Sequence, residues 1–200
     1  MTPMQTIQVD AIQMLAMSIV AVSWVRRSGF PGRIFGLSTE LAGRHIGQAI
    51  LWTLPLLLAL VGLKWVLVSF VPGFEHIPLS PPLKNGFEFG STAAYLVYAA
   101  LVPIQEFLSR GVIQGPMYEL LTGSETRRHF WAILVSNTLF AITHLHLTLA
   151  YGAAAFVGGI FWGLLYARQR SLVGPIVSHI LLGIFALYVL GFADLLKGLS

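Results

Sequence analysis

Long apolar runs alternate with short polar segments along almost the whole chain. A run of about 20 apolar residues is long enough to cross a bilayer as a helix. The pattern therefore predicts an all-α protein, a polytopic transmembrane helical bundle of about six spans that forms a single integral membrane domain over residues 1–200. The runs predicted to be helical are residues 11–25, 49–71, 91–122, 130–149, 151–166 and 172–196.

Two of these runs do not have the length of one upright crossing. Residues 11–25 are short and end at Arg26, so they form either a short span or an interfacial helix. Residues 91–122 are too long, and we expect kinks at Pro103 and Pro116, because proline removes a helical hydrogen bond. One span followed by an amphipathic segment along the interface is the arrangement expected there.

The segments between the runs are predicted to be loops or turns, at residues 28–48, 72–90, 123–129 and 168–171. Three segments are basic and alternate with segments that are poor in basic residues. Because cytoplasmic loops carry an excess of Lys and Arg, these three are placed in the cytoplasm and both termini outside. The basic residues are Arg26, Arg27, Arg33 and Arg44 in the first segment, Arg127 and Arg128 in the second, and Arg168 and Arg170 in the third.

Composition supports the membrane assignment. The mean hydropathy is +0.78 and charged residues make up 10% of the chain, whereas a soluble domain carries about 25%. The net charge of +4 comes from short clusters beside apolar runs, without a basic stripe and interleaved aromatics, so nucleic acid is not an expected partner. The chain has no Cys, which excludes thiol catalysis, disulfides and thiolate zinc sites.

Two further features of the apolar runs concern helix packing. Lys64 interrupts residues 49–71, and it either snorkels to the membrane surface or faces the bundle. Gly159 and Gly163 form a GxxxG pair, which permits close contact between helices. The pair does not show whether the contact lies within one chain or between two, so the oligomeric state stays open.

Four ionisable groups lie inside the later apolar runs: Glu106, Arg110, His144 and His179. A charged side chain at the centre of a membrane helix costs about 2.5–3.5 kcal/mol, and such residues usually mark function. On a helix, Glu106 and Arg110 share one face and are expected to pair. A purely structural ion pair that pins two helices together is the alternative interpretation.

His144, the third of these groups, follows an aromatic residue by four positions. Phe140 and His144 are four positions apart, so their rings are expected to pack on one helical face. If the helix continues, His146 lies about 200° round from His144 and does not converge with it. A single membrane histidine is more often a hydrogen bonder between helices than a catalyst, but two histidines with a Glu and an Arg favour a site.

Such a set suits hydrolysis by an activated water. A carboxylate or imidazole accepts the proton of the water, and a second imidazole stabilises the developing oxyanion. We expect no cofactor to be required; the alternative is a divalent metal such as zinc, because two His and one Glu with an open position is a known zinc arrangement. The ligands in that case would be Glu106, His144 and His179.

Other intramembrane proteolytic chemistries lack their residues here. There is no HExxH sequence for a zinc protease. The only aspartates are Asp10 and Asp194, near opposite ends of the chain, which argues against an aspartyl dyad. Ser109 and Ser178 are not in the Gly-x-Ser setting of a rhomboid-type serine protease.

Three short motifs fall on three of the predicted helices, and together they resemble a known family. They are Gln105-Glu106-x-x-x-Arg110, Phe140-x-x-x-His144 and a single His179. Their order and spacing over roughly residues 90–195 are similar to those of the CPBP family, the CAAX-protease and bacteriocin-processing (Abi) group of intramembrane endopeptidases. Its pattern is Glu-Glu-x-x-x-Arg, then Phe-x-x-x-His, then His-x-x-x-Asn or Asp.

The resemblance implies a helical membrane domain that hydrolyses a peptide bond near the membrane surface. It also implies that the first Glu of the pair and the His of the second motif, here His144, activate a water. The third-motif His, here His179, would form the oxyanion hole with its Asn or Asp partner. Glu106 and Arg110 would be the structural pair.

The chain departs from the family pattern at two positions. Gln105 stands where the first Glu is expected, and an amide is not a base at any useful pH. Gly183 stands where Asn or Asp is expected, and the loss of one oxyanion donor costs about 10²–10³ in rate. Either Glu106 serves as the base together with His144, or the fold survives without proteolysis. The first option requires a different helix rotation, because positions 105 and 106 are about 100° apart.

The sequence thus predicts an intramembrane endopeptidase of the CPBP type. Its predicted catalytic residues are Gln105, Glu106, Arg110, His144 and His179.

 

The substrate would be a peptide or a membrane-protein segment that reaches a cavity between the helices. The alternative is a catalytically inactive family member that binds membrane proteins or peptides as a scaffold or immunity factor, which Gln105 and Gly183 favour. A small transporter that uses the Glu–Arg–His set as a relay is a third interpretation. The expected location is a membrane, the bacterial inner (plasma) membrane, with the lipid bilayer as partner.

Overall fold

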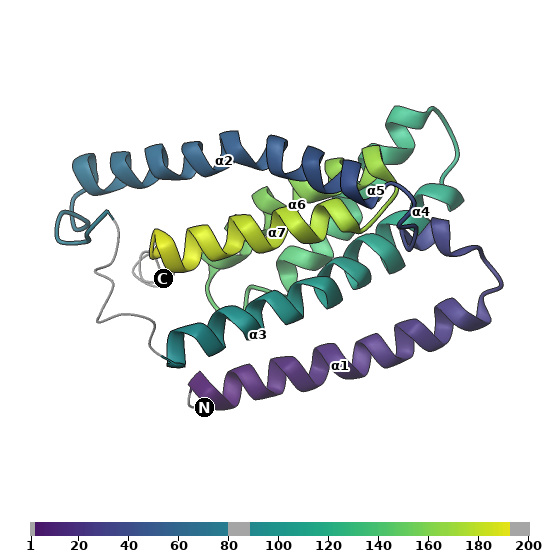
Figure 1. The fold of residues 1–200 in the computed structure, drawn as a ribbon, viewed down its shortest axis with the longest axis horizontal. Helices are drawn as coiled ribbons and strands as arrows, with labels where there is room; N and C mark the ends of the chain where they lie inside the picture. The colour runs from purple at the N-terminus through teal and green to yellow at the C-terminus, as the bar shows by residue number, and fades with distance from the viewer. Residues whose placement is uncertain (1–2, 80–88, 193–200) are drawn as a thin grey trace.

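The computed structural model describes residues 3–79 and 89–192, and all of its regular elements are helical (Figure 1). The α-helices and the segments between them follow one another in a single series. They are α1 (Pro3–Arg27), a 3₁₀ turn (Gly32–Phe35), α2 (Ala42–Phe70), α3 (Phe89–Glu106), a π-helical segment (Phe107–Gln114), α4 (Gly115–Leu120), α5 (Glu125–Ile142), α6 (Leu149–Gln169), α7 (Val173–Ile184) and a second π-helical segment (Phe185–Val189).

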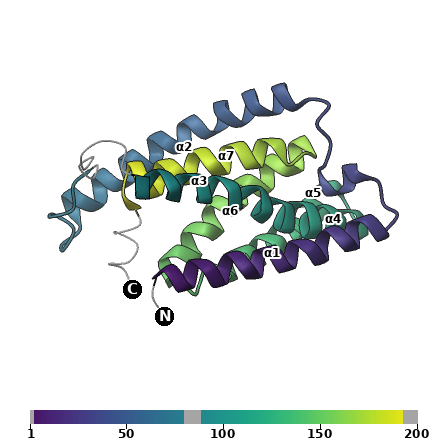
Figure 2. The ribbon, with the colours of Figure 1, turned by 60° about the horizontal axis from the view of Figure 1, so that its bottom comes forward.

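Helix α7 lies inside the bundle, where it contacts α2, α3 and α6. Helix α5 packs along α6, and α1 lies at the edge of the bundle, beside α3 and the first π-helical segment (Figure 2). Because α3, α5, α6 and α7 meet one another either directly or through the first π-helical segment, polar side chains on their inner faces are brought together.

Among the described residues, three helices are long and apolar enough to cross a membrane, and a shorter apolar helix covers Val173–Val189. The three are Ala42–Phe70, Tyr95–Leu120 and Leu149–Gln169. These three helices correspond to the predicted runs 49–71, 91–122 and 151–166, three of about six predicted spans. The predicted runs 11–25 and 130–149 lie largely in α1 and α5, which are helical but are not among these three.

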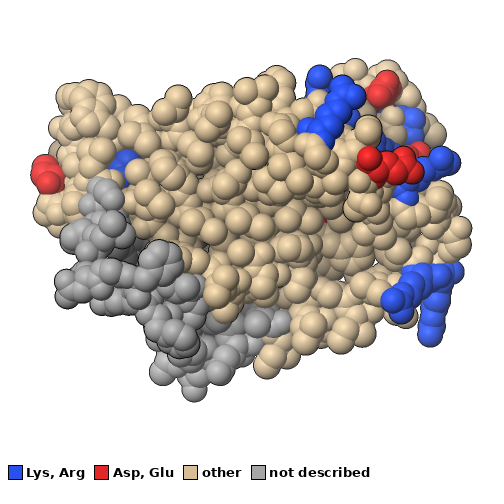
Figure 3. Space-filling view, in the orientation of Figure 1, with Lys and Arg blue, Asp and Glu red and all other residues tan. Residues whose placement is uncertain are grey.

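Most of the face seen in Figure 3 is uncharged. Most of its Lys and Arg atoms lie at the end where α1 ends and α2 begins, beside acidic side chains. Large apolar side chains point outward along α2, as expected for a helix in contact with lipid; examples are Leu51, Leu58 and Phe70. The three predicted basic segments therefore lie towards one end of the bundle, in agreement with their placement on one side of a membrane.

Several predicted boundaries were wrong. The loop predicted at residues 28–48 contains a 3₁₀ turn, and α2 begins at Ala42. The polar turn predicted at 123–129 is shorter, because Ser124 caps α5 by accepting a hydrogen bond from the Arg127 amide at 3.4 Å. The loop predicted at 72–90 lies partly outside the described residues.

The helix predicted at 130–149 ends early and is followed by a turn. Helix α5 ends at Ile142, and α6 begins at Leu149 with Thr148 as its N-cap, whose hydroxyl accepts a hydrogen bond from the Tyr151 amide at 3.1 Å. His144 and His146 therefore lie in the turn between two helices. The predicted angle between them does not apply, because the helix does not continue.

The long run 91–122 is interrupted by the first π-helical segment, which lies between Pro103 and Pro116. Pro103 sits inside α3, and Pro116 sits in the first turn of α4, where a missing amide hydrogen is tolerated. The interruption that was expected as kinks is therefore a change of helical register, a feature often found at functional sites.

Lys64 faces the bundle, which is one of its two predicted positions. Its side chain is 1% exposed, and Nζ donates a hydrogen bond to the Leu190 carbonyl. Leu190 packs with Phe74 and Phe192 in a buried apolar cluster. The ammonium group thus ties α2 to the end of the second π-helical segment.

The GxxxG pair allows α5 and α6 to approach closely, as its spacing predicted. A Cβ atom at Gly159 would lie 1.8 Å from the Asn137 Oδ1 atom, and one at Gly163 would lie 3.0 Å from the Ile133 Cγ2 atom. Asn137 in turn donates from Nδ2 to the Phe156 carbonyl at 2.7 Å. The contact is within one chain, so it does not require an oligomer.

We expect Gly159→Ala to destabilise the protein by about 1–3 kcal/mol, the usual cost of adding a methyl group to a packed interior. The new Cβ would overlap Asn137 and force α5 and α6 apart. Unfolding in detergent, followed by tryptophan fluorescence, measures the change. Gly62→Ala is the matched control, since a Cβ at this helical position meets no atom within 4 Å. Equal stability of the two variants would contradict the prediction.

Candidate active site

Glu106 and Arg110 form the buried ion pair that their spacing predicted. Glu106 ends α3 and Arg110 lies in the following π-helical segment. Both side chains are 0% exposed, and the Arg110 Nε atom is 3.4 Å from the Glu106 Oε2 atom. Two opposite charges removed from water are stable only when each is compensated, so each residue requires the other.

Arg110 is also held by polar groups on two neighbouring helices and on its own segment. Its Nη2 atom donates to the Gly159 carbonyl of α6 at 2.8 Å, and Nη1 is 3.3 Å from both the Ser136 hydroxyl and the Gln114 Oε1 atom. Gln114 repeats the pattern one turn later, donating to the Gly163 carbonyl at 2.8 Å. Because the GxxxG glycines lack side chains, these two polar groups reach the α6 backbone.

His179 of α7 is the second partner of Glu106. Its Nδ1 atom is 2.7 Å from the Glu106 Oε1 atom, and the side chain is 5% exposed. Its ring stacks on Trp162 of α6, with centroids 3.6 Å apart and planes 16° apart. One carboxylate oxygen therefore faces Arg110 and the other faces His179, so the carboxylate fixes the orientation of the imidazole.

Phe140 lies between the two histidines. Its ring centroid is 4.6 Å from that of His144 and 5.9 Å from that of His179, and the Arg110 guanidinium lies 5.7 Å from its centre. The predicted packing of Phe140 against His144 is confirmed, although His144 lies in the turn after α5. Phe140 thus links the second motif to the buried Glu106–Arg110–His179 cluster.

The backbone selects one tautomer of His144. Its Nδ1 atom is 2.8 Å from the Phe140 carbonyl oxygen. A carbonyl oxygen only accepts hydrogen bonds, so Nδ1 carries the hydrogen and the lone pair of the neutral ring lies on Nε2. A neutral imidazole with this tautomer has the chemistry of a general base at Nε2.

Gln105 and Glu106 face different neighbours, as expected for adjacent positions of a helix. The Gln105 side-chain amide donates to the Met14 sulfur of α1 at 3.9 Å, a weak contact at the edge of the bundle. Glu106 faces His179 and Arg110. The geometry therefore favours a positioning role for Glu106 over that of a base acting with His144.

The described residues contain no group of three or more His, Asp or Glu side chains arranged to hold a metal ion. The two serines that the sequence argued against as nucleophiles, Ser109 and Ser178, form hydrogen bonds with other groups. Ser178 shares a 2.7 Å hydrogen bond with Thr53 of α2, and Ser109 donates to the Gln105 carbonyl at 2.7 Å.

Sequence reasoning missed several residues of the site. Gln114 had a detectable signal, since it follows Arg110 by four positions within an apolar run. Trp162 and Tyr98 had none, because their approach to His179 depends on how α3, α6 and α7 pack. Ser136 likewise reaches Arg110 only through the contact between α5 and the π-helical segment.

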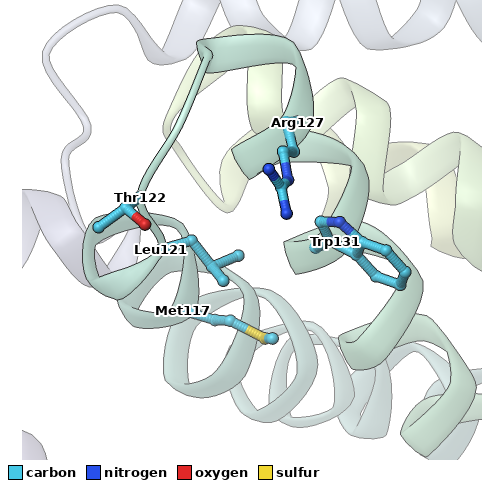
Figure 4. Close-up of a pocket in the computed structure, with 5 residues that line it drawn as sticks. All are labelled: Met117, Leu121, Thr122, Arg127 and Trp131. Carbon is cyan, nitrogen blue, oxygen red and sulfur yellow. The ribbon is translucent and has the colours of Figure 1, made fainter.

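The structure also has a surface pocket of about 340 Å³ away from these residues (Figure 4). Its lining residues come from α4, from the segment that follows and from α5: Met117, Leu121, Thr122, Arg127 and Trp131. None of them contributes to the Glu106–Arg110–His179 cluster. The pocket is therefore separate from the candidate active site.

The fold and the site together define a helical membrane protein with a buried carboxylate–imidazole–guanidinium centre. A family model described as type II CAAX prenyl endopeptidase Rce1-like matches residues 86–185, and the chain belongs to this family. This match confirms the resemblance drawn from the three motifs. No curated protein and no solved structure matches the chain.

Proposed function

We propose that the protein is an intramembrane endopeptidase that hydrolyses a peptide bond with an activated water. The His144 Nε2 atom accepts a proton from the water as its oxygen attacks the carbonyl carbon. The protonated His179 ring donates from Nε2 to the resulting oxyanion. When the intermediate collapses, the C–N bond breaks and His144 returns the proton to the departing amine.

The hydrogen bond between Glu106 and His179 is the observation that carries this proposal. A carboxylate 2.7 Å from Nδ1 fixes the orientation of the imidazole and so directs its Nε2 atom away from Glu106. Arg110 holds the carboxylate in turn, and the α6 backbone holds Arg110. Such prior orientation of a donor is what lowers the energy of a developing negative charge.

We propose that no cofactor takes part and that the protein acts in a membrane, the bacterial inner membrane, on a peptide or membrane-protein segment. The family match supports a peptide substrate, and the three membrane-crossing candidates support a bilayer as partner. About six crossings remain our proposal for the whole chain. Activity that persists in a chelator such as EDTA is the expected result, and its loss with recovery on adding zinc would contradict the cofactor proposal.

The test uses purified protein in detergent and an internally quenched peptide that ends in a farnesylated CAAX sequence, alongside the same peptide without the prenyl group. We expect wild-type cleavage. We expect Gln105→Glu to raise kcat by about tenfold or more, because a carboxylate at position 105 that turns from Met14 towards His144 adds a second base. Gln105→Met is the matched control, of similar size and without a carboxylate. Unchanged rates in Gln105→Glu would show that position 105 does not share in activating the water.

A binding protein without catalysis is the second candidate, favoured by the amide at Gln105 and its contact with α1. A wild type that is silent while Gln105→Glu cleaves would identify a catalytically disabled family member. Silence of both proteins on both peptides, with the peptides still bound in a fluorescence anisotropy measurement, would support this second candidate.

A further inference from the structure

The position that lacks the family's third-motif Asn or Asp is occupied from another helix. Gly183 lies one turn after His179 on α7. A Cβ atom built there would lie 1.7 Å from the Tyr98 hydroxyl oxygen and 2.4 Å from its Cζ atom. No side chain larger than a hydrogen fits at position 183 while Tyr98 stays in place. The phenol therefore takes the space where the missing side chain would begin.

Tyr98 reaches this space from α3, two turns before Glu106. Its ring meets His179 edge to face, with centroids 6.1 Å apart, and meets Tyr188 at 6.3 Å. Its hydroxyl oxygen lies against α7 at Gly183, one helical turn after the His179 that its ring contacts. A phenol carries one O–H donor, so the group that replaces the Asn or Asp side chain keeps the ability to donate.

We infer that the Tyr98 hydroxyl is the second oxyanion donor of the proposed endopeptidase, in place of the absent side chain at position 183. This inference rests on the proposed function. The hydroxyl donates a hydrogen bond to the carbonyl oxygen of the substrate peptide as that oxygen becomes negative, beside the His179 Nε2–H. The phenol keeps its proton throughout, so the step transfers no proton and needs no further reactant.

The same placement explains why a glycine stands at position 183. The chain is helical there, and its backbone does not have the positive φ that favours glycine. The glycine is needed for space, because any Cβ would displace the Tyr98 phenol. The donor can thus come from either of two positions. In this chain Tyr98 supplies it and position 183 is glycine; the alternative is an Asn or Asp donor at position 183 with a smaller residue at position 98.

Tyr98→Phe tests the inference, because it removes the hydroxyl and keeps the ring that packs on His179. In the cleavage assay we expect kcat to fall about 10²–10³-fold, the loss seen when one oxyanion donor is removed, with KM changed less than threefold. Thermal unfolding should stay at the wild-type temperature. Tyr188→Phe is the matched control, a neighbouring tyrosine that also loses only its hydroxyl, and its kcat should match wild type.

A role in packing alone predicts a different set of results. If Tyr98→Phe keeps a kcat within threefold of wild type, the hydroxyl is not a donor and the inference is overturned. A second experiment moves the donor from position 98 to position 183. The double variant Tyr98→Ala with Gly183→Asn should cleave at least tenfold faster than Tyr98→Ala alone. No gain in the double variant, when both proteins fold, also counts against the inference.

The two proposals fail in distinguishable ways. A wild type that cleaves neither peptide, together with a silent Gln105→Glu variant, overturns the proposed function and the role of Tyr98 with it. An active wild type with an equally active Tyr98→Phe variant overturns the role of Tyr98 alone and leaves the proposed function in place.

Discussion

His144→Ala is expected to reduce kcat/KM for peptide cleavage by about 10²–10⁴-fold, the contribution of a positioned general base. No second base is available at the first motif, because position 105 is an amide. The protein should remain folded, since His144 lies in the turn between α5 and α6 and is not part of the buried ion pair. Steady-state kinetics and thermal unfolding measure the two effects.

His146→Ala is the matched control for this result. His146 lies two residues further along the same turn, and its Nδ1 atom bonds the Thr143 carbonyl at 2.8 Å, much as the His144 Nδ1 atom bonds Phe140. The two substitutions therefore remove the same kind of local contact. If both variants keep wild-type kcat/KM, His144 is not the base. If kcat/KM falls equally in both, catalysis requires the structure of the turn and not the His144 imidazole.

Glu106→Ala is expected to destabilise the fold by about 3–5 kcal/mol and to abolish cleavage. Removing one partner of a buried pair leaves an uncompensated charge, here the Arg110 guanidinium in a fully buried site. His179 loses the acceptor at Nδ1 in the same step, so its orientation is lost as well. The free energy of unfolding, from denaturant titration in mixed micelles, measures the first effect.

Two further variants separate the causes. Glu106→Gln keeps the size of the side chain and an oxygen acceptor, so it should lose less stability than Glu106→Ala while cleavage still falls. Glu125→Ala removes an exposed carboxylate that pairs with His129 across one helical turn, and we expect no measurable change in stability. An unfolding free energy of Glu106→Ala within 1 kcal/mol of wild type would show that the pair is not structurally required.

The sequence was sufficient to predict the parts of the site that depend on spacing within one helix. Glu106 and Arg110 pair because they are four residues apart. Phe140 meets His144 at the same spacing, although His144 lies in the turn after α5. Glu106, Arg110 and His179 also converge as expected, because ionisable residues inside apolar helices usually pair with one another. These predictions use only helical geometry and the cost of burying charge.

The remaining parts depend on contacts between helices and were not predicted. The end of α5 at Ile142 has a weak signal, since Leu145 and Leu147 alternate with polar residues beyond it and Thr148 marks the start of the next helix. The stacking of Trp162 on His179 follows from the approach of α6 to α7. The side-chain direction of Gln105 likewise depends on the position of α1.

The first π-helical segment has a consequence for how this chain responds to a change in length. Its hydrogen bonds run from i to i+5, so each of its turns holds one residue more than an α-helical turn. A one-residue deletion between positions 106 and 110 would therefore restore a regular α-helix and leave α3 and α4 near their present orientations. The same deletion would move Arg110 relative to the Gly159 carbonyl of α6, so the site would change although no functional residue had been replaced.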